Sequence, residues 1–155
     1  MTKKVILVSL SFSVISCSFI KCPTYSNEVL KGKSYVNCNM TNFDLSNADL
    51  SDTDFSGAIL DNAIFAGTYA PFSNFTNTSL RNVNFLSSNM QQSNFTSAVM
   101  DNSNFKLADF RGANFTNASL YKIKGTDVKF FGANFNHAKW VTGKTCDKNS
   151  ISVCR

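Results

Sequence analysis

The fold of this chain is decided by a pattern that is clearest in Ala108-Asp109-Phe110-Arg111-Gly112-Ala113-Asn114-Phe115-Thr116-Asn117. The repeated unit has five residues: a small residue, an Asp or Asn, a large apolar residue and two further residues. Counted in fives, the large position recurs without a slip from Met40 to Trp140, and 19 of its 21 occurrences are Phe, Leu, Met or Trp. A period of five matches neither an amphipathic helix nor an alternating strand. The chain must therefore turn a corner every five residues, with one large and one small side chain pointing inward.

Sorting the large positions by twenty separates them into columns of like residues. One column holds only Phe: Phe55, Phe75, Phe95, Phe115 and Phe135. Like residues stacked over like are what a solenoid with 20-residue coils would produce. At about 4.8 Å per coil, the repeats predict about five coils and a body about 25 Å long. The same count places Asp61, Arg81 and Asp101 in one outward column, and Asp109 beside Lys129.

The repeats resemble those of the pentapeptide-repeat family, whose consensus is Ala-(Asp/Asn)-Leu-x-x. Ala48-Asp49-Leu50, Ala108-Asp109-Phe110 and Ala113-Asn114-Phe115 match it directly, and the resemblance covers residues 40–142. It implies an all-β fold, a right-handed quadrilateral β-helix with four repeats in each square coil.

The N-terminus has the features of a targeting segment. Lys3 and Lys4 precede an uncharged run, residues 5–20, that is too short and too rich in Ser for a membrane span. Val14-Ile15-Ser16-Cys17 resembles a bacterial lipobox, in which Cys17 would be lipidated and begin the mature chain. An ordinary cleavage site and an uncleaved anchor are the alternatives. We expect residues 1–16 to be an export signal, with the mature protein periplasmic or anchored as a lipoprotein.

Cysteine usage agrees with export. Processing at Cys17 removes it from pairing and leaves an even number of cysteines, two on each side of the repeats: Cys22, Cys38, Cys146 and Cys154. Exported proteins can keep disulfides, and cytosolic proteins usually cannot. We predict a Cys146–Cys154 disulfide, and with it Cys22–Cys38, because each pair is local and lies beyond one end of the repeats. Other connectivities, and four free thiols in a cytosolic protein, remain open.

Both ends of a solenoid expose core and unpaired backbone, so both need caps. We expect residues 17–39 to form an N-terminal linker and cap, with one helical turn over residues 26–31, followed by repeats over 40–142. Residues 143–155 are expected to form a C-terminal cap. This end, with Trp140, Gly143 and two cysteines, resembles a tail found in exported pentapeptide-repeat proteins.

Two repeats break the pattern, at residues 68–72 and 121–125, where the large position is only Ala70 or Gly125. Local bulging is one interpretation. The other is a surface for a protein partner, because exposed aromatic residues beside an Arg are typical of interfaces. The candidate face consists of residues that the twenty-residue count places together: Tyr69, Pro71, Phe72, Arg111 and Phe131.

Catalytic and metal-binding patterns find little support. His137 is the only His and has no nearby nucleophile, so a catalytic triad is not indicated. Residues 52–57 match the first half of a calcium loop, but its twelfth position is Ala63, where a Glu should bind. The sequence contains no Cys-x-x-Cys pair of the kind that binds zinc. We therefore expect no cofactor and no enzyme activity.

The charge distribution leaves two function classes. Residues 40–140 hold seven Lys or Arg against eight Asp, too even a balance for a nucleic-acid-binding stripe. The leading interpretation is an exported, non-enzymatic structural or protein-binding scaffold of the bacterial envelope, its partner unknown, touching membrane only through a lipid anchor. The alternative comes from the family, some of whose members shield DNA gyrase by mimicking DNA. That role needs a cytosolic, strongly acidic rod.

Overall fold

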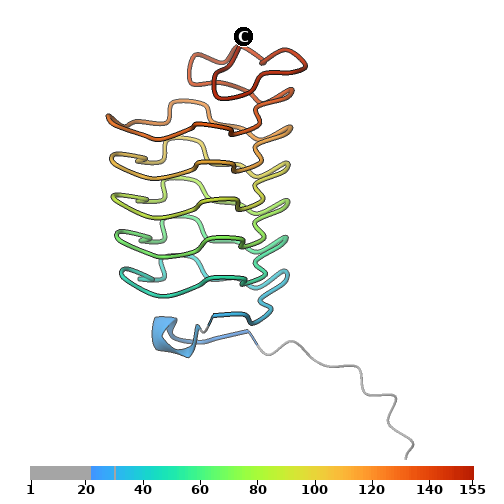
Figure 1. Ribbon diagram of the computed structural model, residues 1–155. Coiled ribbons are helices and arrows are strands. Elements are labelled where there is room, and N and C mark those ends of the chain that lie inside the picture. Colours follow the sequence, from blue (N-terminus) through green and yellow to red (C-terminus); the bar gives the residue numbers. More distant parts are fainter. Residues whose placement is uncertain (1–21, 30) are drawn as a thin grey trace, which may run out of the picture.

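The computed structural model describes residues 22–29 and 31–155. The expected export signal at residues 1–16 and the lipidation site at Cys17 lie outside the described residues. The described residues contain one helix, the short 3-10 helix η1 (Ser26–Glu28). The remainder consists of turns and short loops joined by isolated β-bridges. Figure 1 shows the chain stacked into coils, with η1 at one end and the C-terminal tail at the other. No helix in the described part of the chain is long and apolar enough to cross a membrane.

The coils have the predicted 20-residue period. Parallel bridges join residues twenty apart, from Ser34 with Asp54 to Ser119 with Lys139. Each coil contains four turns, one for every five residues. Backbone hydrogen bonds hold successive coils together: the Phe55 N–H donates to the Asn74 carbonyl (2.8 Å), and the Asn74 N–H donates to the Thr53 carbonyl (2.9 Å). The chain is therefore a β-helix whose parallel pairing is made one bridge at a time.

The large positions fill the core. All of them from Met40 to Leu120 are at most 2% exposed. The rings of the Phe column stack, with centroids 4.8 Å apart between Phe75 and Phe95 and 5.2 Å apart between Phe95 and Phe115. Such offset stacks add to the hydrophobic burial of each ring. Ring stacking, together with burial, thus runs along the whole solenoid.

The coil begins earlier in the chain than expected. Tyr35 stacks on Phe55 with centroids 5.6 Å apart, and Ser34 already bridges Asp54. The segment expected to be linker and cap at 17–39 therefore contributes repeat-like turns at 31–32 and 36–37. The period was hidden there because Lys33 stands two places before Tyr35, where the repeat has a small residue. The helical turn expected over 26–31 is shorter, since η1 ends at Glu28.

Local chemistry explains the consensus. The Asn74 Oδ1 accepts the backbone N–H of Thr76 (3.1 Å) and its hydroxyl (2.7 Å), which closes the turn. The second residue of each turn has φ near +60°, a conformation that Asn and Gly tolerate best, as at Asn77 (φ 58°) and Gly67 (φ 68°). Each unit therefore carries its own turn signal beside its inward residues.

Inward hydroxyls are satisfied by carbonyls of the neighbouring coil. The Ser73 hydroxyl donates to the Leu50 carbonyl (2.6 Å), and the Ser93 hydroxyl donates to the Ala70 carbonyl (2.7 Å). Ser88 is the exception: its buried hydroxyl is the one side-chain polar atom of the described residues that is buried without a hydrogen-bond partner.

The outward charge column has the predicted placement, but its charges pair only in part. Backbone bonds from Asn62 N–H to Arg81 and from Asn82 N–H to Asp101 confirm that Asp61, Arg81 and Asp101 lie in successive coils. Arg81 pairs with Asp61 (3.9 Å), but no ion pair of the described residues joins it to Asp101. The Asp101 Oδ1 instead accepts hydrogen bonds from the Tyr121 N–H (3.1 Å) and the Ser119 hydroxyl. A parallel backbone β-bridge makes Asp109 and Lys129 neighbours in adjacent coils, as expected.

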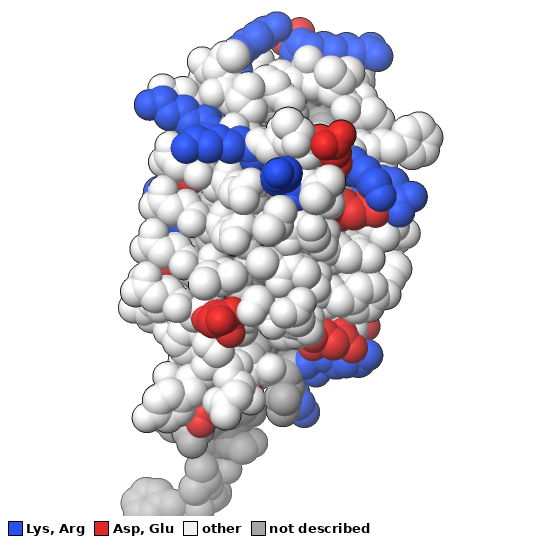
Figure 2. Space-filling model, turned by 90° about the vertical axis from the view of Figure 1, so that its left-hand side faces the viewer, with Lys and Arg blue, Asp and Glu red and all other residues white. Residues whose placement is uncertain are grey.

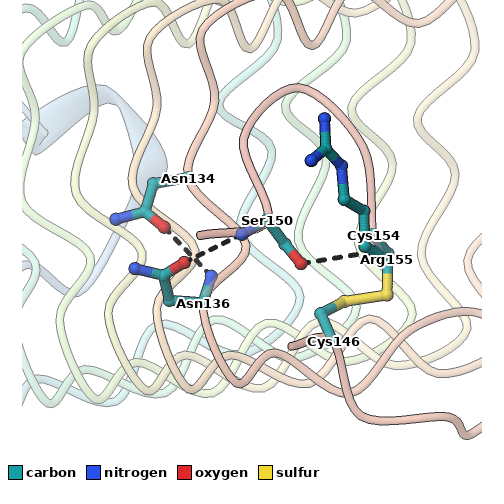
Figure 3. The surroundings of a disulfide bond; sticks show 6 residues. All are labelled: Asn134, Asn136, Cys146, Ser150, Cys154 and Arg155. Carbon is teal, nitrogen blue, oxygen red and sulfur yellow. Dashed lines mark hydrogen bonds between the residues drawn. A yellow bond between two sulfur atoms is a disulfide. The ribbon is translucent and has the colours of Figure 1, made fainter. Parts of the chain in front are cut away.

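The C-terminal tail covers the last coil. The Phe135 N–H donates to the Ser150 carbonyl (2.8 Å), in the place that a further coil would take, and Ile151 pairs antiparallel with Asn134. The Ser150 N–H donates to the Oδ1 of Asn136 in the last coil (3.1 Å), and the Ser150 Oγ accepts the Arg155 N–H within the tail (3.2 Å), as Figure 3 shows. Cys146 and Cys154 are joined by a disulfide beside these contacts. The tail therefore satisfies backbone groups that the end of a solenoid would leave open.

At the other end, η1 has a similar role. The Ser26 Oγ accepts the N–H of Asp44 (3.0 Å) in the first coil, and the Tyr35 hydroxyl donates to the Glu28 carbonyl (3.2 Å). A disulfide joins Cys22 to Cys38, which ties this segment to the first coil.

Candidate interaction surface

One corner of the solenoid carries large exposed aromatic side chains. Tyr69 is 49% exposed, Phe72 57% and Phe131 81%. Parallel bridges from Tyr69 to Asn89, Asn89 to Asp109 and Asp109 to Lys129 place these repeats above one another. The structure therefore brings four of the predicted residues to one side of the coil, and we call Tyr69, Phe72, Arg111 and Phe131 the aromatic corner.

The fifth predicted residue, Pro71, does not belong to this surface, because it is buried. It is the first turn residue of its coil and lies between the equivalent positions Ser51, also buried, and Gln91, half-buried. Pro71 is covered between these two neighbours, whereas Phe72, the next residue, is exposed, as are Arg111 and Phe131, which occupy the turn position of Pro71 two and three coils further on. The prediction that Pro71 lies on the exposed face was wrong for this reason.

Phe72 is held in an unfavourable backbone conformation. Its φ is +59°, in the left-handed region, where most equivalent turn positions carry Asn, Gly, Ser or Asp. A non-glycine residue with a bulky side chain is disfavoured there by roughly 1–2 kcal/mol. The exposed ring recovers little of this cost through burial. Leu107, Lys122 and His137 adopt the same conformation at equivalent turn positions, and Phe72 is the one Phe, Tyr or Trp of the described residues that does so.

Arg111 is oriented by its neighbour Asp109. The Arg111 Nε donates to Oδ1 (2.9 Å) and Nη2 donates to Oδ2 (2.7 Å), a bidentate arrangement. Partial burial by itself raises the pKa of the Asp109 carboxyl, but the hydrogen bonds from Arg111 and the charges of Arg111 and Lys129 outweigh it, so the pKa lies below its ordinary value. The guanidinium is thus held in place while its outer edge stays accessible.

A shallow depression lies between Arg111 and Phe131. Its lining residues come from three successive coils: Gln91, Gln92, Arg111, Gly112, Phe131 and Gly132. Gly112 and Gly132 lack the side chains that would fill its floor, and both have the left-handed φ of a second turn residue (68° and 75°). Amides, a guanidinium and an aromatic ring therefore surround an open, shallow floor.

Sequence reasoning missed the glutamines and glycines of this depression. A usable signal was present, because Gly112 and Gly132 are twenty residues apart and Gln91 and Gln92 depart from the small and Asn-rich turns. It also missed Leu107, which is 47% exposed with φ +60° on another side of the coil.

The residues considered for chemistry lie elsewhere. His137 is an exposed turn residue of the last coil with φ +58°. The Asp54 Oδ1 accepts the Ser56 N–H (3.0 Å) and the Asn74 side-chain amide (3.0 Å), so it closes a turn. No group of three or more His, Cys, Asp or Glu suited to a metal ion occurs in the described part of the chain.

Two family models match this chain. The model for a pentapeptide repeat region matches residues 38–115, and the model for eight copies of the pentapeptide repeat matches residues 108–139. The chain belongs to the pentapeptide-repeat family. A search of the curated proteins found no match.

Solved structures of other pentapeptide-repeat proteins are similar to this one at low identity. QnrB1 (R167E, trypsin-treated), a plasmid-mediated fluoroquinolone resistance protein, is 21% identical, with 72% of this chain and 74% of that chain covered and a TM-score of 0.38. A pentapeptide repeat protein from the thylakoid lumen of Arabidopsis thaliana is 20% identical (76% and 74% covered, TM-score 0.34). Rfr23 from the cyanobacterium Cyanothece 51142 is also 20% identical (76% and 90% covered, TM-score 0.36). These likenesses concern the repeat and assign no partner to this pentapeptide-repeat protein.

Proposed function

We propose that this pentapeptide-repeat protein is an exported, non-enzymatic scaffold of the bacterial envelope that binds a protein partner through the aromatic corner. The observation that carries the proposal is Phe72, an exposed ring kept in a left-handed turn. Selection for the fold alone would favour Asn or Gly at this position. A partner that buries the ring would offset the strain.

The neighbouring side chains support the same role. Phe131 offers a second apolar anchor, and Arg111, held by Asp109, offers hydrogen-bond donors in a fixed orientation. Aromatic and Arg side chains dominate the binding energy of protein interfaces. The rigid solenoid keeps these groups in place before binding, which lowers the entropic cost of association.

We also propose that each coil is square in cross-section and right-handed, as the family resemblance implies. The four turns within every 20-residue coil support a square outline. An experimental structure that showed left-handed coils would contradict this part of the proposal.

Photo-crosslinking in the native host tests the binding role. A photoreactive phenylalanine analogue at position 131 is expected to give one discrete adduct, and Phe72→Asn in the same chain should abolish it. The matched control carries the analogue at position 107, because Leu107 is also exposed and also has a positive φ but lies away from the corner. The same adduct from position 107, or none from position 131, would argue against the proposal.

Export is tested separately. Cell fractionation followed by mass spectrometry of the N-terminus should find a mature chain that begins at or near Cys17. The lipobox-like Val14-Ile15-Ser16-Cys17 motivates this expectation. Intact protein beginning at Met1 in the cytosol would contradict it.

Thiol labelling tests the compartment by another route. Both disulfides, Cys22–Cys38 and Cys146–Cys154, need an oxidising environment to persist. Protein that is denatured without reduction should therefore expose few free thiols. Four free thiols in protein from the native host would sink the export proposal together with the disulfides.

The alternative function, a DNA-mimic shield of gyrase, is less well supported. Residues 22–120 contain five Lys or Arg and eight Asp or Glu. Residues 121–155 contain seven Lys or Arg and two Asp. Such a rod is acidic over only part of its length. Protection of gyrase supercoiling from a quinolone by the purified protein would favour the alternative over the scaffold.

A further inference from the structure

Positive charge is concentrated at the C-terminal end of the solenoid. Residues 121–155 carry seven Lys or Arg and two Asp, a side-chain charge of +5, whereas residues 22–120 carry a side-chain charge of −3. On the face shown in Figure 2, most Lys and Arg side chains lie towards this end. This segregation gives the end a positive field that is able to attract anions.

The cations of this end form no salt bridge in the described residues, although Lys129 lies near enough to Asp109 to help lower the pKa of its carboxyl. The salt bridges of the described residues join Lys31 to Asp49, Arg81 to Asp61 and Arg111 to Asp109, all outside residues 121–155. Lys122 and Lys139 both place their ammonium groups near the Tyr121 ring, at 5.0 Å and 4.7 Å from its centroid. Two like charges that share one ring repel each other, so an anion between or above them would be favourable.

Apolar side chains are exposed at the same end. Ile151 is 45% exposed and Val153 is 51% exposed, and both lie in the tail between Lys148 and Arg155. The backbone of the tail is held by hydrogen bonds to Ala133 and Phe135. The Cys146–Cys154 disulfide, drawn in Figure 3, closes the loop that carries Ile151 and Val153.

The core beneath the tail is also open. Gly125 ends the column of Leu45, Phe65, Phe85 and Phe105, because an added Cβ would lie 2.8 Å from the Lys106 nitrogen of the coil below. Several large apolar residues of this coil are only partly buried: Ile123, Val128, Phe130 and Trp140.

We propose that this C-terminal end is a peripheral docking surface for an anionic lipid membrane. Lysines without a salt bridge beside exposed aliphatic side chains are the combination that membrane interfaces favour, since lysines bind headgroup phosphates while aliphatic groups enter the boundary with the acyl chains. An acidic protein would account for the lysines but not for Ile151 and Val153. The proposal uses a surface distinct from the aromatic corner and does not depend on the function proposed for it.

Trp140 is the sole tryptophan of the chain and reports on this end alone. We expect its fluorescence to shift to shorter wavelength on addition of phosphatidylglycerol vesicles and to be quenched when the acyl chains are brominated. Phosphatidylcholine vesicles should have little effect. Raising the salt from about 0.05 M to about 0.5 M should reverse the change, because surface charges are then screened. The full chain is used, and residues 1–21 cannot mimic the signal, because they contain no tryptophan.

Matched variants separate the two contributions. The double variant Lys144→Gln with Lys148→Gln should weaken partitioning of the protein onto phosphatidylglycerol vesicles about 25-fold, because each lost cation should cost about fivefold. Val153→Ser should weaken it several-fold without changing the salt dependence. Two control variants should leave partitioning unchanged. One is Lys31→Gln with Lys33→Gln, at the opposite end of the solenoid, and the other is Ile59→Ser, on an exposed side of the coils. Circular dichroism confirms that each variant is folded.

Three outcomes would overturn the proposal. The first is an unchanged Trp140 spectrum with phosphatidylglycerol vesicles, and the second is an equal response to phosphatidylcholine. The third is a response to poly-glutamate but not to vesicles, which would assign the end to an acidic protein.

Discussion

The Phe column and the aromatic corner have the same backbone and opposite environments. In the column, Phe75, Phe95 and Phe115 are fully buried and their rings stack at 4.8–5.2 Å. In the corner, Phe72 and Phe131 are 57% and 81% exposed. The difference arises from position within the five-residue unit, because the central residue points inward and the turn residues point outward.

This contrast separates residues that stabilise the fold from residues that are free to acquire a function. A column position is constrained by rings above and below it, so it tolerates few substitutions. A turn position is constrained mainly by its backbone conformation, and a residue that violates that preference, as Phe72 does, is more informative about function than a buried Phe.

The largest expected effect breaks the column. Phe95→Ala should lower the free energy of unfolding by about 3–5 kcal/mol, because it leaves a cavity between two stacked rings. Phe131→Ala is the control and should change it by no more than about 0.5 kcal/mol, because its side chain is already exposed. Urea unfolding followed by circular dichroism measures both. Similar losses for the two variants would invalidate the contrast.

The next test removes strain from the corner. Phe72→Asn should raise the free energy of unfolding by about 1 kcal/mol, because Asn tolerates the left-handed conformation, while it abolishes the crosslink from position 131. The reverse substitution, Asn77→Phe at an equivalent turn with φ +58°, should lower it by about 1 kcal/mol. Thermal and urea unfolding measure both changes. A destabilising Phe72→Asn would show that the ring supports the fold.

A smaller effect concerns the inward hydroxyls beside the column. Ser93→Ala should cost about 1 kcal/mol, because the Ala70 carbonyl loses its donor. Ser88→Ala should be neutral or stabilising, since the Ser88 hydroxyl is buried without a partner. The same unfolding experiments compare them. Equal costs for the two variants would indicate that Ser88 has a partner in solution.

The smallest effect is the part of the pH dependence of stability that Asp109 contributes beside the corner; the pKa values of the Asp44 and Asp49 carboxyls, elsewhere on the coils, are lowered too. The folded-state pKa of Asp109 lies below its ordinary value of 3.8, so its contribution is fully present above pH 3.8 and is lost as the pH falls through the lowered value. For such a pair the change should be at most about 1 kcal/mol. Asp109→Asn should remove it. The outer residues of the Phe column are mostly Asn, such as Asn94, and do not titrate. Urea unfolding at a series of acidic pH values measures how the free energy of unfolding depends on pH. The same pH dependence in Asp109→Asn as in the unchanged protein would contradict this account.

The five-residue period, read from the sequence, determined most of the fold. Each unit carries an inward pair and a turn signal, so the 20-residue coil and its columns follow from spacing alone, as the bridges of the structure confirm. Tyr69, Phe72, Arg111 and Phe131 could be placed on one side of the coil by the same count. The family follows from the same residues.

The tertiary structure decided what spacing does not encode. Exposure within a turn depends on neighbours in the adjacent coils, which is why Pro71 is buried while Phe72 is not. The partner of an outward charge depends on rotamers and nearby donors, so Asp101 accepts bonds from Ser119 and Tyr121 instead of pairing with Arg81. The ends depend on which segments cover them, because a cap has no repeat to follow and is specified only by the unpaired backbone groups that it satisfies.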